Sequence, residues 1–492
     1  MRIALPLLAS LLAIPALAAS SARAGDTIDP IVPGEVVVRA ETPKALSAAL
    51  SALSSGFGGV GVVDSIEGRP IYLISYELGP KQTADQVDLL LDNLTRAGVL
   101  AWNELNYAGQ TGEGQTGSLW LSGVGLDAGA FANQYARDLL GLDLAHARSR
   151  GAGVVVAVID TGIDASHPAL GGRVSTLGAS FVAGSASTAD TGNGIDDDGD
   201  GLVDEQVGHG TFVAGLVHLV APDAAILPVR VLDDEGIAGN FQISKALAWA
   251  IDRGADVVNM SLGETYRSAA LEDIVDEARM AGMVVVGAAG NLDQERLRVF
   301  PACDDNAIGV AALDWSDVRA PFSNYNERLN LSAPGDSAIV DGTVDPARAI
   351  VGPVPGGAFA AWEGTSFATA FTSGLAALVL AQHPDWPTKA VSGPTVLSTV
   401  LAHLAASSVP ISAQNPGYTG LLGAGRIDAA TVTLFAPVAP PLGDLDLDRM
   451  VDAVDLGILL GSWGPCEPSL RADLNADGKV DAVDLGILLG AW

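Results

Sequence analysis

The middle of the chain alternates between continuous apolar runs and stretches with helical periodicity. Three runs predict strands buried on both faces and two stretches predict helices: 154–160, 255–262 and 283–291, then 241–254 and 268–282. Apolar strands alternating with helices predict an α/β fold, in which helices cover both faces of a parallel sheet. In such sheets functional groups gather beyond the carboxyl ends of the strands, where Asp160 and Asn291 stand.

A smaller set of elements precedes this region. The pattern predicts three strands and two helices of a small α+β unit: 33–39, 69–78 and 101–109, then 45–53 and 83–98. A Gly-rich stretch at 109–125 has the composition of a mobile, cleavable connector. A Pro-rich spacer lies near the C-terminus.

These changes in pattern divide the chain into six parts. They are a signal peptide (1–24), an α+β domain (25–110), a Gly-rich linker (111–130), the α/β domain (131–435), a Pro-rich linker (436–442) and a C-terminal module (443–492). The first part carries one Arg, an apolar core broken by Pro6 and Pro15, and then small residues. This pattern favours a removed secretion signal, with a membrane anchor as the alternative. No later segment is apolar enough to span a bilayer, so we expect an exported protein.

Acidic residues outnumber basic ones among the 492 positions, 58 to 26, for a net charge of −32. Nucleic acids and anionic membranes would be repelled, whereas cations would be attracted. Only Cys303 and Cys466 carry thiols. A single bridge between them is open, and two unpaired thiols is the simpler interpretation.

Three short polar stretches carry the candidate chemistry: 158–162 with Asp160, 208–211 with His209, and 364–366 with Ser366. Each has an ordinary explanation when taken alone, for example a Ser as the N-cap of a helix. Together they supply what a hydroxyl nucleophile needs, which is a base and an anion that fixes the tautomer of that base.

The order Asp, His, Ser resembles that of the subtilisin-type serine peptidases (subtilases, peptidase family S8). The resemblance implies that Ser366 is the nucleophile, His209 the general acid/base and Asp160 its orienting carboxylate. It also implies that the amide of Asn291 binds the oxyanion. The activity implied is secreted endopeptidase action on protein or peptide substrates. The alternative is an inactive, calcium-dependent surface or scaffold protein on the same fold, which would be expected to lack one of these four residues.

The leading α+β unit resembles the inhibitory propeptide of this family, which templates folding and blocks the cleft until it is cut. An N-terminal domain retained in the mature protein is the alternative.

An acidic insert, NGIDDDGDGLVDE at 193–205, lies just before His209. Four carboxylates fall at positions one, three, five and nine of an EF-hand-like loop: Asp196, Asp198, Asp200 and Asp204. Position twelve is Val207, so the loop is incomplete. Crowded carboxylates repel one another unless a cation lies among them, which favours Ca²⁺ over a solvated acidic turn.

The sequence VDAVDLGILLG occurs at 451–461 and again at 480–490. Each copy follows oxygen ligands spaced as in an EF-hand: Asp444, Asp446, Asp448, Asp452 and Asp455 in the first, and Asp473, Asn475, Asp477, Asp481 and Asp484 in the second. Each loop has only an exit helix, so two such halves must pack together to bury their apolar faces. The tail resembles a type I dockerin module. That resemblance implies Ca²⁺ binding and a cohesin-like scaffold partner; a calcium-stabilised cap or a secretion-related tag is the alternative.

Overall fold

The computed structural model describes residues 30–339, 342–384, 386, 395–434, 443, 445, 451–466, 470, 472–475 and 477–492. The predicted signal peptide (1–24) and Pro-rich linker (436–442) lie outside the described residues, as do Asp444, Asp446 and Asp448.

A seven-stranded parallel sheet in the order β12-β11-β10-β9-β5-β7-β6 forms the centre of the molecule. Its strands are β5 (Val155–Asp160), β6 (Ala179–Ser180), β7 (Ala225–Arg230), β9 (Val257–Met260), β10 (Val284–Ala288), β11 (Ile308–Leu313) and β12 (Leu331–Pro334). Successive side chains of a strand point to opposite faces. In β5, Val156 and Val158 therefore belong to one apolar core, while Ala157 and Ile159 belong to another.

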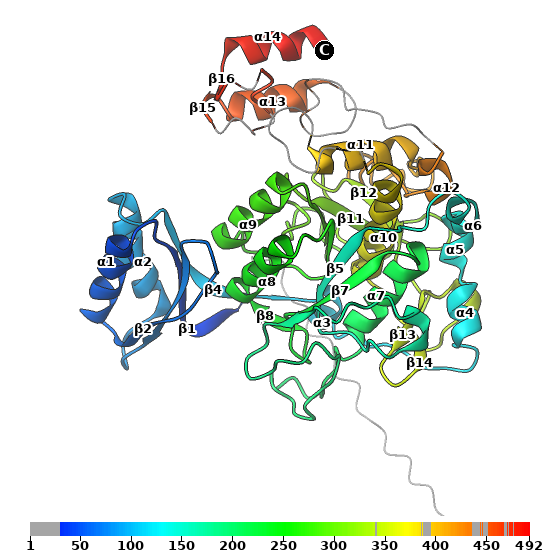
Figure 1. Cartoon of the computed structure of the whole chain (residues 1–492), viewed down its shortest axis with the longest axis horizontal. Helices are drawn as coiled ribbons and strands as arrows, with labels where there is room; N and C mark the ends of the chain where they lie inside the picture. The colour runs from blue at the N-terminus through cyan, green and yellow to red at the C-terminus, as the bar shows by residue number, and fades with distance from the viewer. Residues whose placement is uncertain are drawn as a thin grey trace, which may run out of the picture.

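Helices cover both faces of this sheet, as the sequence predicts (Figure 1). The first core contains residues of α7 (His209–Val220), α10 (Thr365–Gln382) and α11 (Val396–Ser407). The second contains residues of α8 (Asn240–Asp252) and α9 (Ala269–Met280). The expectation that no segment after the signal is apolar enough to span a bilayer is wrong for α10, which among the described residues alone passes that test by length and composition. Its 18 residues are 83% buried, as expected of a core helix.

The N-terminal unit is a five-stranded sheet in the order β2-β3-β1-β4-β8 with two helices (Figure 1). Its elements are β1 (Ile31–Arg39), α1 (Pro43–Ser54), β2 (Gly58–Ser65), β3 (Ile71–Glu77), α2 (Ala84–Arg96) and β4 (Trp102–Gln110). The fifth strand, β8 (Ile237–Gly239), comes from the central region and pairs with β4. The sequence pattern did not predict β2, whose three glycines and exposed positions give little alternation.

Polar side chains of β4 cap the two helices that face the N-terminal unit. Glu104 accepts hydrogen bonds from the backbone N–H groups of Ala269 and Ala270 at the start of α9. Asn106 accepts one from Phe241 N in the first turn of α8, at 3.0 Å. The first turn of a helix has unsatisfied N–H groups and a partial positive charge, so these contacts fix the N-terminal unit to the central region. Burial raises the pKa of Glu104 to about 7, against the hydrogen bonds that it accepts.

The segment after β4 differs from the expected mobile connector. Thr111, Gly112 and Glu113 are buried, and α3 (Gly112–Thr116) begins inside the central region. The prediction of mobility is therefore wrong for this part, because tertiary contacts that the composition does not reveal hold the chain in place.

The remaining elements of the central region lie around the sheet. They are α4 (Ala128–Ala132), α5 (Tyr135–Leu139), α6 (Leu142–His146), β13 (Val351–Val354), β14 (Ala358–Ala361), α12 (Ala429–Val432) and the 3₁₀ turns Pro168–Leu170 and Pro346–Arg348. Both cysteines are free, as the simpler interpretation predicts.

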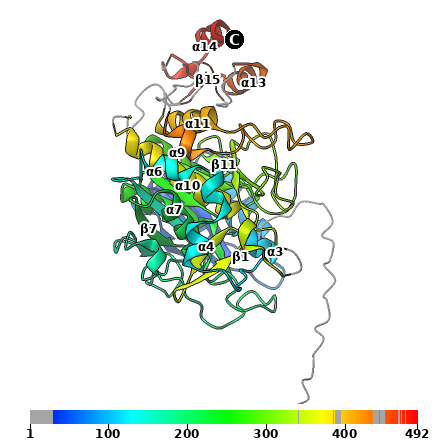
Figure 2. The same cartoon turned by 90° about the vertical axis from the view of Figure 1, so that its right-hand side faces the viewer.

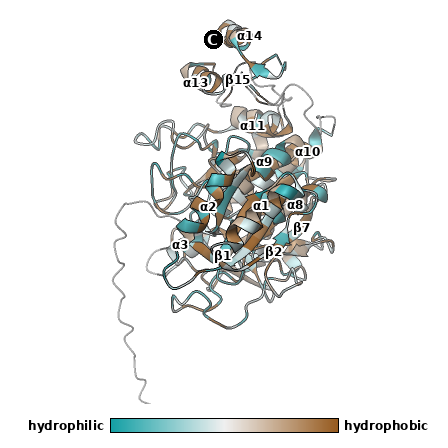
Figure 3. Cartoon of the chain, turned by 90° about the vertical axis from the view of Figure 1, so that its left-hand side faces the viewer, coloured by the Kyte–Doolittle hydropathy of each residue, from teal (hydrophilic) through white to brown (hydrophobic). Residues whose placement is uncertain are grey.

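The C-terminal tail forms two similar halves (Figure 2). It contains α13 (Ala453–Gly461), β15 (Gly464–Pro465), β16 (Lys479–Val480) and α14 (Ala482–Ala491). Leu459 and Leu488, which are equivalent in the two repeats, are fully buried in one small core. Apolar residues colour parts of both α13 and α14 (Figure 3). Val454 and Val483, which are equivalent in the two repeats, are exposed. The two repeats thus bury one apolar face against each other.

Candidate active site

Three separate elements bring Asp160, His209 and Ser366 together. Asp160 is the last residue of β5, His209 the first of α7 and Ser366 the second of α10. All three are buried, and His209 Nδ1 lies 2.7 Å from Asp160 Oδ1. Ser366 Oγ and His209 Nε2 contact one and the same oxygen atom, Glu113 Oε2, at 2.7 and 3.1 Å.

Two glycines beside His209 permit this approach. Gly208 has φ of +103°, a left-handed conformation that glycine adopts without strain. A Cβ on Gly210 would lie 2.1 Å from the carbonyl oxygen of Gly162, so no larger residue fits between α7 and the end of β5. The imidazole of His209 therefore reaches Asp160 only because the residues on either side lack side chains.

Asp190 holds the turn before α7 and was not among the predicted site residues. Its carboxylate accepts hydrogen bonds from Gly208 N, Thr211 N and Thr211 Oγ1, at 3.0, 3.1 and 2.6 Å. Burial raises its pKa to about 6, against these bonds. Since Asp190 stands far from any motif in the sequence, only the folded chain shows that it fixes the backbone around His209.

Asn291 follows β10 and turns its amide nitrogen toward Ser366. Its Oδ1 accepts hydrogen bonds from Thr365 N and Thr365 Oγ1, at 2.9 and 2.8 Å. These bonds fix the orientation of the side chain, so that Nδ2 is free to donate into the site. In this structure Nδ2 donates to Glu113 Oε1 at 3.0 Å.

Glu113 occupies the centre of the site, and sequence reasoning did not find it. This side chain is fully buried. Its carboxylate contacts Ser366, His209 and Asn291. A Cβ on Gly364 would lie 1.6 Å from Glu113 Oε1, so the carboxylate fits only because that position is glycine. Nothing in a single Glu within a Gly-rich stretch indicates this placement.

The pKa values reflect how tightly these groups interact. Burial alone would raise the pKa of Glu113, but the hydrogen bond and charge of His209, and then the bonds from Ser366 and Asn291, hold it below its ordinary value. Burial alone would lower the pKa of His209, but the charge of Asp160 and the bonds to Asp160 and Glu113 raise it to about 10. In this arrangement the positive charge of a protonated His209 is stabilised by two carboxylates, Asp160 and Glu113.

The chain before Glu113 lies in the central region as an extended peptide. Ala108, Gly109 and Gln110 pair with β8 in antiparallel fashion. Gln110 also exchanges two backbone hydrogen bonds with Gly263, at 3.0 and 2.9 Å. A strand inserted between two backbone edges is a recurring way in which proteins bind peptides. After Thr111 the chain coils into α3, where the carbonyl of Gly112 accepts a hydrogen bond from Thr116 Oγ1 at 3.2 Å.

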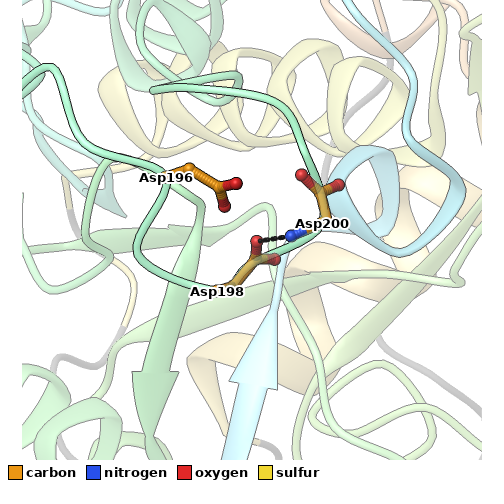
Figure 4. Close-up of side chains that lie close together, drawn as sticks. All are labelled: Asp196, Asp198 and Asp200. Atoms are coloured by element: carbon orange, nitrogen blue, oxygen red, sulfur yellow. Dashed lines mark hydrogen bonds between the residues drawn. The ribbon is translucent and has the colours of Figure 1, made fainter.

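The structure brings three acidic side chains of the insert close together (Figure 4). Carboxylate oxygens of Asp196, Asp198 and Asp200 lie within 4.8 Å of one another. Asp204 points elsewhere in the same loop, where it accepts hydrogen bonds from Asn193 N and Gly194 N. Oxygen ligands at this spacing suit a hard cation such as Ca²⁺, so the first three residues fit a metal site.

The two loops of the tail have equivalent geometry where the structure describes them. Asp455 and Asp484 are fully buried and each caps its helix through the N–H of the residue three positions earlier, Asp452 and Asp481. In the second loop, Asp473 accepts hydrogen bonds from Asp477 N and Gly478 N. Asn475, also in this loop, donates through its side-chain amide to Asp477. The acidic side chains thus organise the loop backbone around themselves.

Comparisons with known proteins agree with this fold. The model of the subtilase family matches residues 151–425, and the chain belongs to that family. Subtilisin NAT of Bacillus subtilis subsp. natto is 38% identical over 248 residues, which cover 48% of this chain and 58% of that protein. Subtilisin BL of Lederbergia lenta is 35% identical over 292 residues, which cover 58% of this chain and 91% of that protein.

Two solved structures share the fold. Fervidolysin from Fervidobacterium pennivorans, described as a keratinolytic enzyme related to subtilisin, superposes with a TM-score of 0.61 at 20% identity over 84% of this chain and 62% of its own. A protease from Pseudoalteromonas arctica gives a TM-score of 0.54 at 26% identity over 63% of this chain and 98% of its own.

Proposed function

We propose that this protein is a secreted serine endopeptidase made as an inhibited precursor. The observation that carries the proposal is the convergence of Ser366 Oγ, His209 Nε2 and Asn291 Nδ2 on one carboxylate, with Asp160 behind the imidazole. A peptide carbonyl placed where that carboxylate lies would meet a nucleophile, a base and an oxyanion donor at once.

The mechanism is acyl transfer. Ser366 attacks the peptide carbonyl carbon while His209 takes the hydroxyl proton, and Asp160 stabilises the imidazolium that forms. Asn291 Nδ2 donates to the oxyanion. His209 then passes its proton to the leaving amine, and a water molecule, activated by the same imidazole, releases the acyl group. The test is internal cleavage of a denatured protein such as casein by the processed chain. Absence of cleavage under conditions where the processed chain is folded would support the inactive scaffold alternative.

Replacing Asn291 by Ala is expected to lower kcat by about a hundred- to a thousand-fold with little change in KM, since the amide acts on charge that develops in the transition state. This magnitude is the one known from removal of the equivalent amide in subtilisin. Kinetics on a peptide anilide substrate measure it. Partly exposed Asn306, whose amide donates to Asp276, supplies the matched control Asn306→Ala, which should leave kcat unchanged.

The N-terminal unit and the segment through α3 act in this proposal as the inhibitory part of the precursor. Support comes from β4, which pairs with β8 as a bound peptide would, and from Glu113, which fills the place of the reacting carbonyl. The carbonyl of Gly112 is held within α3, so the uncut segment resists attack. Processing then requires that α3 unwinds and that the Glu113 carboxylate leaves the site.

Inhibition by Glu113 is expected to depend on pH with two limits. Because the pKa of Glu113 is lowered, the contribution of its charged carboxylate to inhibition is fully present above the ordinary pKa of 4.5. That contribution is lost as pH falls through the lowered pKa. Because the pKa of His209 is raised, the contribution of its protonated imidazole to inhibition is lost as pH rises through about 10. The reaction rate of the uncut chain with a serine-directed fluorophosphonate, divided by that of Glu113→Gln, measures the effect. A ratio that is lowest near pH 5–6 and rises toward pH 10 is expected; a flat ratio would contradict it.

Calcium is the proposed cofactor, held in the insert by Asp196, Asp198 and Asp200 and in the tail by the two loops. Its chemistry would be electrostatic only: it would offset the repulsion between carboxylates and fix the loops. In the tail, Ca²⁺ at about a hundred times its dissociation constant should slow amide hydrogen exchange in α13 and α14 by about a hundred-fold. Exchange mass spectrometry on Ser366→Ala with and without a chelator measures this. Equal exchange in both conditions would mean that the tail holds no calcium.

The tail is proposed as an attachment module for a cohesin-like partner, with export to the cell exterior. The exposed, equivalent valines of the two repeats, Val454 and Val483, are the observation in its favour.

A further inference from the structure

The acidic insert has a gap in its ligand set that another segment fills. Position twelve of the EF-hand-like loop, where a carboxylate normally completes calcium coordination, is Val207. Glu235, in the turn between β7 and β8, extends into this loop from outside it. Its Oε1 accepts hydrogen bonds from Asp197 N and Asp204 N, at 3.2 and 3.5 Å. The side chain is only 2% exposed.

The second oxygen of this carboxylate has no partner of its own. Glu235 Oε2 and Glu205 Oε2 are both buried and accept no hydrogen bond among the described residues. Glu235 and Asp200 are both close enough to Glu205 for their carboxyl groups to interact electrostatically with it. Two buried carboxylates that face one another are costly unless a cation or a proton lies between them.

In the part of the chain that the structure describes, no basic side chain supplies that positive charge. Between residues 190 and 235 the sequence holds a single Arg or Lys, Arg230. Its guanidinium donates to the carbonyl oxygens of Ala189 and Thr191. The ion pairs of the described residues bring no other Lys or Arg to the insert or to Glu235.

We propose that Glu235 supplies the missing carboxylate of the calcium site in the insert, with Glu205 beside it. This inference rests on the proposed calcium site of Asp196, Asp198 and Asp200 and extends it to a segment 30 or more positions along the chain. A hard divalent cation with six to eight oxygen ligands suits such a crowded, all-oxygen environment.

The same cation would also affect the segment that pairs with β4. Glu235 is followed by Gly236, whose carbonyl accepts a hydrogen bond from Thr111 N at 3.1 Å, and then by β8, which pairs with β4. Calcium bound by Glu235 would therefore hold the edge strand on which a peptide lies. Loss of this cation should raise KM for long peptide substrates more than it lowers kcat.

Calcium binding by Glu235→Gln tests the inference in the full-length chain carrying Ser366→Ala, which cannot digest itself. Glutamine keeps the size of the side chain and an oxygen that accepts the two loop N–H groups. We expect equilibrium dialysis to give one calcium fewer per chain, or at least a tenfold weaker affinity at one site. The rise of Tm on adding calcium should shrink accordingly. Exposed Glu327, paired with Arg298 at the surface, gives the matched control Glu327→Gln, which should bind calcium as the parent does.

Two further variants separate the possible outcomes. Asp198→Asn should lose the same calcium as Glu235→Gln. If Asp198→Asn loses a calcium and Glu235→Gln binds as the parent does, Glu235 is not a ligand, while the site in the insert stands. If both variants bind calcium as the parent does, the insert holds no calcium site and Glu235 is not a ligand. The proposed peptidase activity is tested separately on the processed chain. If Glu205→Gln and Glu235→Gln bind calcium as the parent does and are more stable than it without calcium, a shared proton explains the pair and the inference is overturned.

Discussion

Replacing Ser366 by Ala is expected to reduce kcat for peptide hydrolysis by about a million-fold, the size of effect known when the nucleophile of subtilisin is removed. In the proposed mechanism this hydroxyl forms the acyl intermediate, and alanine leaves the oxyanion donor Asn291 and the fold in place. A residual rate about a thousandfold above that of water is expected from those remaining groups. The measurement is kcat of the processed chain on a peptide anilide. Because Ser366→Ala cannot process itself, wild-type enzyme must first cleave the N-terminal unit from it.

The matched control is Ser166→Ala, at an exposed serine whose hydroxyl bonds only to Asp164. It should leave kcat within about twofold of the parent. A loss of only tenfold in Ser366→Ala would mean that another group performs the attack.

Replacing Glu113 by Ala is expected to raise the rate at which the uncut chain reacts with a fluorophosphonate by about a hundred- to a thousand-fold. The carboxylate makes charge-assisted hydrogen bonds to Ser366, His209 and Asn291 in a fully buried place. Removing one partner of such a buried network is destabilising by about 3–5 kcal/mol, and here the destabilised state is the inhibited precursor. The reagent must also occupy the space that the carboxylate leaves.

Exposed Glu67 of the N-terminal unit provides the control variant Glu67→Ala, which should react as slowly as the parent. Far-UV circular dichroism checks that the fold is retained. If Glu113→Ala reacts at the parent rate, some other part of the precursor, for instance the pairing of β4 with β8, blocks the site.

Continuous apolar runs made three of the seven strands of the central sheet predictable from the sequence, namely β5, β9 and β10. Strands such as β5 are buried on both faces, so nearly all of their residues are apolar. The position of Asp160 at the end of β5, and of Asn291 shortly after β10, followed from the same pattern. The resemblance to subtilases then supplied their proposed roles.

Contacts between distant segments could not be predicted in the same way. Glu113, Asp190 and Glu235 each act through neighbours that are far away in the sequence, and none stands in a recognisable motif. The Gly-rich composition around Glu113 even favoured a mobile connector, because composition reports the intrinsic freedom of a segment and not the groove into which it packs. Strand β2, with few alternating positions, was missed for a similar reason.

Mapping the fluorophosphonate adduct on the processed chain by peptide mass spectrometry tests the central claim most directly. Our account predicts a single adduct on the peptide that contains Ser366, formed with loss of peptidase activity and absent when His209 is replaced by Ala. An adduct on a different serine, or a folded and processed chain that takes up no reagent at all, would contradict it.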